Sequence, residues 1–203
     1  MKIVMKIAAA CAAVSMVFGL SGCNEVKNAE NTLNSAMESL QKGDFISAAQ
    51  YIEFTGDSDQ ESQFAQFEEN QDTAAALFSK MTYTINSSEK TDGSNVKMNV
   101  TVTNADMKTV FSNVISDMFS IALSNAFASE EEQLSDEEMQ NKIFELLKDG
   151  INDENVQTVT NTVDVNVAKT DGGWKVQVDS DVLDAATGGL VSTAESMGSV
   201  FGE

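Results

Sequence analysis

The sequence contains no proline, no histidine and no arginine, and it has two cysteines. Histidine is the usual general acid or base, so an enzyme built from this chain would need a buried Asp, Glu, Lys or Tyr with a shifted pKa. Without arginine, the chain lacks the guanidinium group that best binds phosphate and carboxylate. Zinc and iron sites would lack histidine and free cysteine ligands. We therefore expect no metal and no cofactor.

Basic residues are also scarce, and the formal net charge is −20. A surface of this sign repels nucleic acid and anionic lipid headgroups, so we expect no nucleic-acid partner. The apolar content of 42% is typical of a globular chain rather than a disordered one. The simplest interpretation of the charge is that it keeps an exposed domain in solution.

The first 22 residues have the pattern of a targeting segment. Lys2 and Lys6 precede an uncharged run from Ile7 to Leu20, which is too short to span a bilayer. Leu20-Ser21-Gly22 then leads to Cys23. This stretch resembles a bacterial lipoprotein signal with its lipobox, which implies a diacylglyceryl group on Cys23 and cleavage before it. The alternative is an ordinary secretory signal with a cysteine nearby by chance.

The lipobox predicts a lipoprotein signal peptide over residues 1–22. The rest of the chain is long enough for one domain, and the pattern of elements described below predicts a single α+β domain over residues 23–203, in which 184–203 is a less regular tail. Two acyl chains on Cys23 would hold this domain at the cell membrane, on its extracytoplasmic face. Loss of Lys2 and Lys6 with the leader changes the net charge from −20 to −22. Cys11 is lost as well, so the mature chain would have no disulfide.

Helical periodicity dominates the first part of the mature domain. Apolar residues recur at helical spacing from Val26 to Leu40, and Gly43 is expected to stop this helix. Asp44 is expected to cap a short second helix whose inner face ends at Ile52, and a third is expected from Phe64 to near Lys80. Four acidic residues at the start of this third segment have partial EF-hand spacing: Asp57, Asp59, Glu61 and Glu68. Ser62 replaces the glycine that a calcium loop requires, so we interpret them as a helix start.

Two pairs of alternating runs predict two β-hairpins. The first pair covers residues 81–85 and 96–102, with Asp92-Gly93 between them as a turn that tolerates positive φ angles. The second covers residues 159–167 and 174–178, joined by Asp171-Gly172-Gly173. Four strands of this kind predict an antiparallel sheet.

Two helices are expected between the hairpins. The first is capped near Asn104 or Asp106, and its expected inner face consists of Met107, Val110, Phe111, Val114, Ile115, Met118 and Ala122. The second begins with a capping box of Ser135 and Glu138 and is expected to turn Met139, Ile143, Phe144 and Leu147 inward. In the tail, the apolar spacing from Leu190 to Phe201 allows a short amphipathic helix.

This order of elements resembles small bacterial lipoproteins related to the nuclear transport factor 2 and cystatin-like α+β superfamily. Four short stretches carry the resemblance: Gln41–Phe45 with Ala48 and Tyr51; Val100–Met107; Gly173–Val176; and Leu183–Leu190. The resemblance implies a curved sheet wrapped on helices, often with a conical pocket. Most such lipoproteins have no assigned activity.

These features predict a lipid-anchored binding or interaction domain without catalytic activity, whose partner is an envelope protein or a small apolar ligand. Tyr83, Met98 and Trp174 are candidate cavity-lining residues, with core packing as the alternative. The alternative function is a histidine-free enzyme resembling the cone-fold isomerases or cyclases. A deep apolar cavity would favour the ligand, and a filled core with exposed apolar surface would favour the protein partner.

Overall fold

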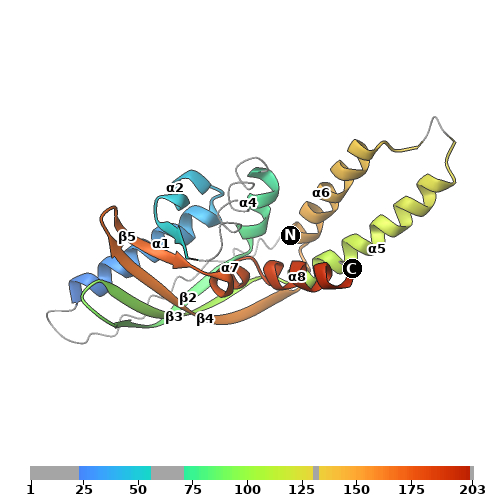
Figure 1. The fold of residues 1–203 in the computed structure, drawn as a ribbon. Coiled ribbons are helices and arrows are strands. Elements are labelled where there is room, and N and C mark those ends of the chain that lie inside the picture. Colours follow the sequence, from blue (N-terminus) through green and yellow to red (C-terminus); the bar gives the residue numbers. More distant parts are fainter. Residues whose placement is uncertain (1–22, 56–70, 130–132, 202–203) are drawn as a thin grey trace, which may run out of the picture.

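The computed structural model describes residues 23–55, 71–129 and 133–201. The leader and the acidic EF-hand-like segment, together with Phe64 and Phe67, lie outside these ranges. Helices and one five-stranded mixed sheet make up the described residues, so the α+β prediction is confirmed. A helical hairpin projects from one end of this body (Figure 1).

The sheet contains both predicted hairpins and one additional strand. Its strands are β1 (Ile52–Phe54), β2 (Thr82–Lys90), β3 (Asn95–Ala105), β4 (Thr158–Thr170) and β5 (Gly173–Val178), in the order β1-β5-β4-β3-β2. The pairs β2–β3, β3–β4 and β4–β5 are antiparallel, whereas β1 runs parallel to β5. The prediction of a wholly antiparallel four-stranded sheet is therefore corrected.

The fifth strand arises where a helix was expected to continue. Helix α2 (Phe45–Ala49) has Asp44 as its N-cap, as predicted, but it ends before Ile52. The carbonyl of Tyr51 accepts a hydrogen bond from the Val176 N–H over 2.7 Å, and this draws the chain onto the edge of β5. Ile52 then faces Val176 in register. Ile52 is half-buried against the core, and it reaches this position by pairing in the sheet rather than on a helix.

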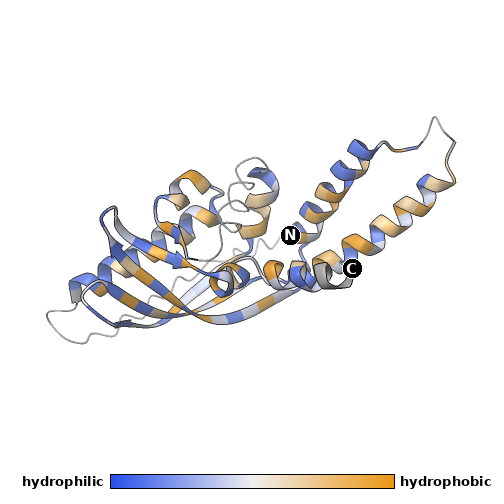
Figure 2. Ribbon diagram, viewed as in Figure 1, coloured by the Kyte–Doolittle hydropathy of each residue, from blue (hydrophilic) through white to orange (hydrophobic). Residues whose placement is uncertain are grey.

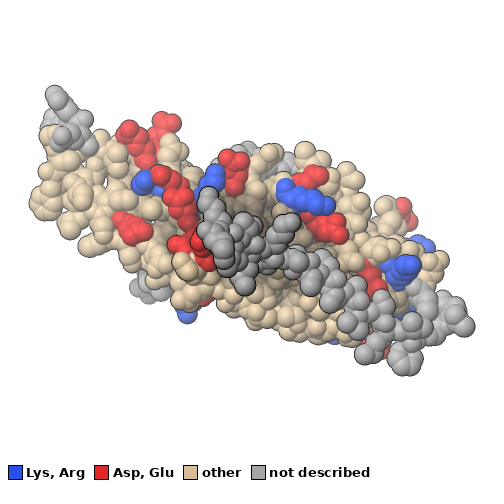
Figure 3. Space-filling model, turned by 180° about the vertical axis from the view of Figure 1, so that it is seen from behind, with Lys and Arg blue, Asp and Glu red and all other residues tan. Residues whose placement is uncertain are grey.

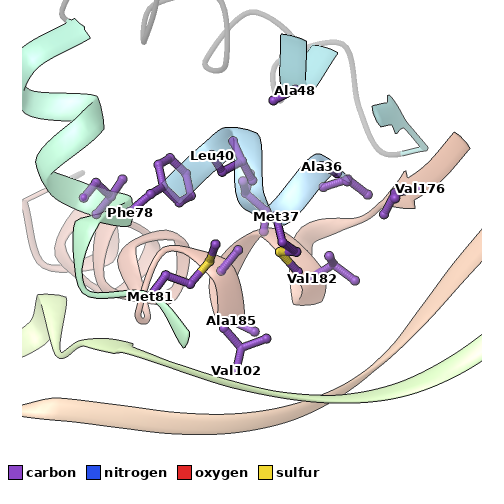
Figure 4. Close-up of a cluster of buried hydrophobic side chains, with 14 of the residues drawn as sticks. Ala36, Met37, Leu40, Ala48, Phe78, Met81, Val102, Val176, Val182 and Ala185 are labelled. Atoms are coloured by element: carbon purple, nitrogen blue, oxygen red, sulfur yellow. The ribbon is translucent and has the colours of Figure 1, made fainter. Parts of the chain in front are cut away.

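One face of the sheet is covered by helices and holds the core. Helices α1 (Cys23–Gln41), α4 (Gln71–Ser79) and α7 (Ser180–Ala186) lie over it together with α2 (Figure 1). Figure 4 shows Met37 of α1, Phe78 of α4 and Val182 of α7 gathered with Met81 above the strands. The inner positions of β3 are nearly all valine or methionine and are fully buried, which is typical of a strand at the centre of a one-sided sheet.

The opposite face of the sheet is polar. Thr101 lies beside Thr162 with 2.9 Å between their hydroxyl oxygens, and Thr103 lies beside Thr160 with 2.7 Å. No described helix covers this face (Figure 1). The period-two alternation of the sequence thus correctly predicted which side is buried in the four predicted strands.

The turn between β2 and β3 is present, but it forms differently from the prediction. None of its residues has a positive φ angle, and Gly93 therefore does not serve the expected purpose. Instead, the carboxylate of Asp92 accepts hydrogen bonds from the Ser94 N–H and from the Asn95 side chain. These bonds hold the turn and lower the pKa of Asp92.

The projecting hairpin consists of α5 (Met107–Ala126) and α6 (Asp136–Asn152), and we call these two helices with their connection the arm. Asp106 caps α5, so of the two expected caps Asn104 is excluded and lies in β3 instead. Helix α8 (Leu190–Phe201) packs near the base of the arm (Figure 1). Its range agrees with the amphipathic spacing of the tail.

The capping box at the start of α6 is confirmed. The Ser135 hydroxyl oxygen accepts a hydrogen bond from the Glu138 N–H, and the Glu138 carboxylate accepts one from the Ser135 N–H over 2.8 Å. These bonds to Ser135, first from its N–H and then from its hydroxyl, lower the pKa of Glu138 below its ordinary value of 4.5. A lowered pKa means that the carboxylate stabilises the helix above pH 4.5 and that this stabilisation is lost as pH falls through the folded-state pKa.

We expect Ser135→Ala to open the first turn of α6, because it removes the N-cap acceptor at a cost of about 1 kcal/mol. Hydrogen exchange of the Glu138 and Met139 amides, which bond to Ser135, should become roughly five-fold faster at neutral pH. Ser112→Ala, within α5 on the same arm, is the matched control and should leave these amides unchanged. Equal exchange in the two variants would contradict the role of the box.

Candidate functional site

The proposed lipid attachment point lies at one end of the described molecule. Cys23 is the first residue of α1, and Ala29 and Leu33 of the same helix are already fully buried. Helix and core therefore begin almost immediately after the cysteine. The start of α1 and the free end of the arm lie at opposite ends of the molecule (Figure 1).

The three candidate lining residues lie on three different strands. The Tyr83 hydroxyl of β2 donates a hydrogen bond to Asn34 of α1 over 2.9 Å. Met98 of β3 is fully buried, and Trp174 of β5 is half-buried against the core. None of the three lines the apolar cavity of the structure, so their role in ligand binding stays a prediction.

That cavity lies between α1 and the β1–β5 edge of the sheet. It has a volume of about 30 Å³ and only apolar lining: Leu33, Ala36, Met37, Leu40, Ile52, Phe54, Phe78, Val176, Val178, Val182, Leu183 and Ala186. Pockets for small ligands have volumes of about 300–1,000 Å³. The cavity is therefore comparable in size to a packing defect that holds about one water molecule.

The buried polar groups of the described residues are Thr32, Asn104 and Thr187. None of these side chains ionises in the physiological pH range. The enzyme alternative requires a buried carboxylate or tyrosine at a pocket floor, and no described residue supplies one. Within the same residues, no group of three or more His, Cys, Asp or Glu side chains is arranged to hold a metal ion.

A wide, open hollow of about 550 Å³ lies between β4 and α7 and contains Asp164, Asp179, Asp181 and Asp184. Asp179 caps α7 by accepting from the Val182 N–H, and Asp184 accepts from the Ser192 N–H. These two carboxylates thus serve neighbouring helix starts.

Asp164 faces the outer side of the sheet and forms a salt bridge with Lys97, with 2.9 Å between Nζ and the carboxylate oxygen. A hydrogen bond from the Asn99 side chain and the contact with Lys97 both lower the pKa of Asp164. In turn, Asp164 raises the pKa of Lys97. Both groups are exposed, so the pair is typical of a surface ion pair rather than a reactive centre.

Most of the large exposed apolar side chains of the described residues are on the arm. Ile115, Phe119 and Leu123 of α5 and its C-cap residue Phe127 recur every four residues, and 46%, 70%, 52% and 84% of their surfaces are exposed. We call these four residues the arm stripe. Apolar colouring continues toward the free end of the arm, where no described element covers it (Figure 2). A row of large exposed apolar side chains on one helix face is a candidate interaction site.

The inner faces predicted for the two arm helices are correct only in part. Met107, Val110 and Val114 are buried as predicted, but Ile115 is not, and Ala122 is exposed as well. On α6, Ile143 and Phe144 were also expected to point inward, yet each is 36% exposed. The two helices pack on each other and, at their base, on α4 and α8, so the core covers the base of the arm and not its free half.

The comparisons with known proteins do not identify a family for this chain. No protein-family model and no curated protein matches this chain. Among solved structures, YcdA, a proposed lipoprotein from Bacillus subtilis, matches this chain with a TM-score of 0.49 and 13% identity. The match covers 84% of this chain and 57% of YcdA, so the chain spans a little over half the length of that protein.

Similarity at this level leaves the resemblance to the nuclear transport factor 2 and cystatin-like superfamily a prediction. Within residues 23–55, 71–129 and 133–201, no helix combines the length and the apolar character needed to cross a membrane. The site that these residues define best is the arm stripe.

Proposed function

We propose that this chain is a lipid-anchored extracytoplasmic protein that binds another protein through the arm. Cys23 would carry the lipid, and the arm stripe would form the contact surface. The observation that carries the proposal is the row from Ile115 to Phe127, which is exposed at the end of the molecule opposite Cys23. A domain held to the membrane at one end would present this row to a partner at the other.

The size of the cavity favours a protein partner over a small ligand. The space between α1 and the sheet is about 30 Å³, whereas the exposed apolar side chains are on the arm. The outer face of the sheet consists mainly of polar side chains that bond to each other, as in the Thr101–Thr162 pair. Such a face has few unsatisfied groups to offer.

The anchor is tested by Cys23→Ser. We expect wild-type protein in the membrane fraction and the variant in the soluble extracytoplasmic fraction, because two acyl chains at about 0.8 kcal/mol per methylene hold the chain stably. Cys11→Ser, within the leader, is the matched control and should remain at the membrane. A Cys23→Ser chain that stays in the membrane fraction would refute lipid attachment at this residue.

The contact surface is tested by placing a photo-cross-linking amino acid at Phe119 in cells. We expect discrete protein adducts at this position, because its side chain is 70% exposed within an apolar row. The control is the same cross-linker at Thr162, an exposed residue of the polar sheet face, which should give none. Absence of any protein adduct at Phe119 would overturn the proposed function.

A further inference from the structure

We propose that the partner of the arm is the arm of a second copy of this chain, with the two α5 helices packed antiparallel about a two-fold axis. This inference rests on the proposed function, since it names the protein that the arm stripe binds. It is carried by the charge, the shape and the extent of the exposed half of α5.

The charge of α5 fits a like-charged partner. Two copies with a net charge of about −20 each repel one another unless they meet over an uncharged surface. From Thr109 to Ala128 the chain has one ionisable side chain, Asp117. Asp117 is two residues from both Ile115 and Phe119 and therefore projects from another side of the helix. In Figure 3 most atoms at the end of the arm are neither acidic nor basic.

The shape of α5 is self-complementary. Each of the first three residues of the arm stripe is followed by a serine, and Ser116, Ser120 and Ser124 form a row of small side chains beside the stripe. Their hydroxyls donate to backbone carbonyls four residues earlier, over 2.9, 3.1 and 2.9 Å. They are thus satisfied within the helix and need no partner.

One helix face therefore presents both a ridge of large apolar side chains and a groove floored by small ones. In an antiparallel pair, the ridge of each copy fits the groove of the other, which is the packing of rows at four-residue spacing. A surface that is complementary to itself produces a closed two-fold dimer.

The extent of the stripe sets the strength of the contact. Ile115 to Phe127 covers about 20 Å of helix, and two helices side by side are about 20 Å wide, so each copy offers roughly 400 Å². The total of about 800 Å² is below the roughly 1,200 Å² of stable interfaces. We therefore expect a weak dimer that attachment of both copies to one membrane favours, because confinement raises their effective concentration.

The decisive test is the Phe119 cross-link in cells that express two copies with different tags. We expect one adduct that carries both tags and has twice the mass of the chain. An adduct with one tag and a foreign mass would overturn the second-copy inference and leave the proposed function standing. No adduct at all would overturn both.

Purified Cys23→Ser chain gives an independent measurement by sedimentation over a range of concentrations. We expect a reversible monomer–dimer equilibrium whose dissociation constant rises at least about 100-fold in Phe119→Glu, because the change buries an unpaired charge. Ile46→Glu is the matched control, since Ile46 of α2 is 66% exposed away from the arm. Circular dichroism confirms folding of both variants, and equal dissociation constants for the two would overturn the inference.

Discussion

Gly188→Ala is expected to lower the free energy of unfolding by about 3 to 5 kcal/mol. A Cβ atom on Gly188 would lie 1.9 Å from the carbonyl oxygen of Ala105, which is backbone and has no rotamer with which to escape. The φ angle of +66° adds about 1–2 kcal/mol of strain for a residue with a side chain. The remainder is the overpacking cost of separating the α7–α8 turn from the end of β3.

Gly188 also holds the start of the arm through a hydrogen bond. The Gly188 carbonyl accepts a hydrogen bond from the Met107 N–H over 3.0 Å, and Met107 is the first residue of α5. Displacing the turn would therefore weaken the base of the arm as well as the sheet. A loss of this size is a large share of the 5–15 kcal/mol that stabilise a typical domain.

Gly189→Ala provides the matched control, because its φ angle of +84° carries similar strain while its nearest neighbour, the Ser192 hydroxyl, is 3.7 Å away. We expect a loss of about 1–2 kcal/mol in this variant. Urea denaturation of both variants at neutral pH measures the difference. Equal losses would show that the close approach to Ala105 costs nothing and that backbone strain alone is at work.

Sequence periodicity predicted most of the elements of this fold. The alternation from Val96 to Val102 lies within β3, and the helical spacing from Val26 to Leu40 lies within α1. Periodicity could not predict β1, because its three residues are too few to show a period-two alternation. Its parallel pairing with β5 depends on a contact between residues more than a hundred positions apart.

The site was harder to predict for a different reason. The spacing of α5 showed correctly that one side of the helix is apolar, and Ile115 was placed on it. Apolar spacing does not reveal whether the chain itself supplies a covering element. Phe119, Leu123 and Phe127 continue from Ile115 in steps of four, and this continuation was the available signal. Only the three-dimensional arrangement shows that the row extends beyond the core.

Among the buried polar residues that the structure describes, Asn104 has the most side-chain hydrogen bonds. It is fully buried at the end of β3, and its amide donates to the carbonyl of Leu77 over 2.9 Å and to that of Ala186 over 2.7 Å. These carbonyls belong to the last turns of α4 and α7, where helix carbonyls have no partner within the helix. One side chain thus closes two helix ends against the sheet.

Asn104→Leu is expected to cost about 4 kcal/mol at any pH between 4 and 7, because it leaves two buried carbonyls unpaired at about 1–3 kcal/mol each. Leucine has the same number and branching of side-chain heavy atoms as asparagine, but its methyl groups are bulkier than the amide atoms, so part of the loss is overpacking. The comparison with wild type at each pH cancels the titration of the surface acids, which is the same in both chains.

Asn104→Asp should instead show a loss that depends on pH. A carboxylate at this position would face two carbonyl oxygens and has no proton to donate, so burial and these oxygens raise its pKa above the unfolded value of about 3.9. With a raised pKa, the loss relative to wild type is smallest below pH 4 and grows as pH rises through the folded-state pKa. Urea denaturation at pH 4 and pH 7 measures both losses. If the loss in the Asp variant were as independent of pH as the loss in the Leu variant, the carboxylate at position 104 would have to be hydrated. That result would contradict a water-free site in which Asn104 bonds directly to α4 and α7.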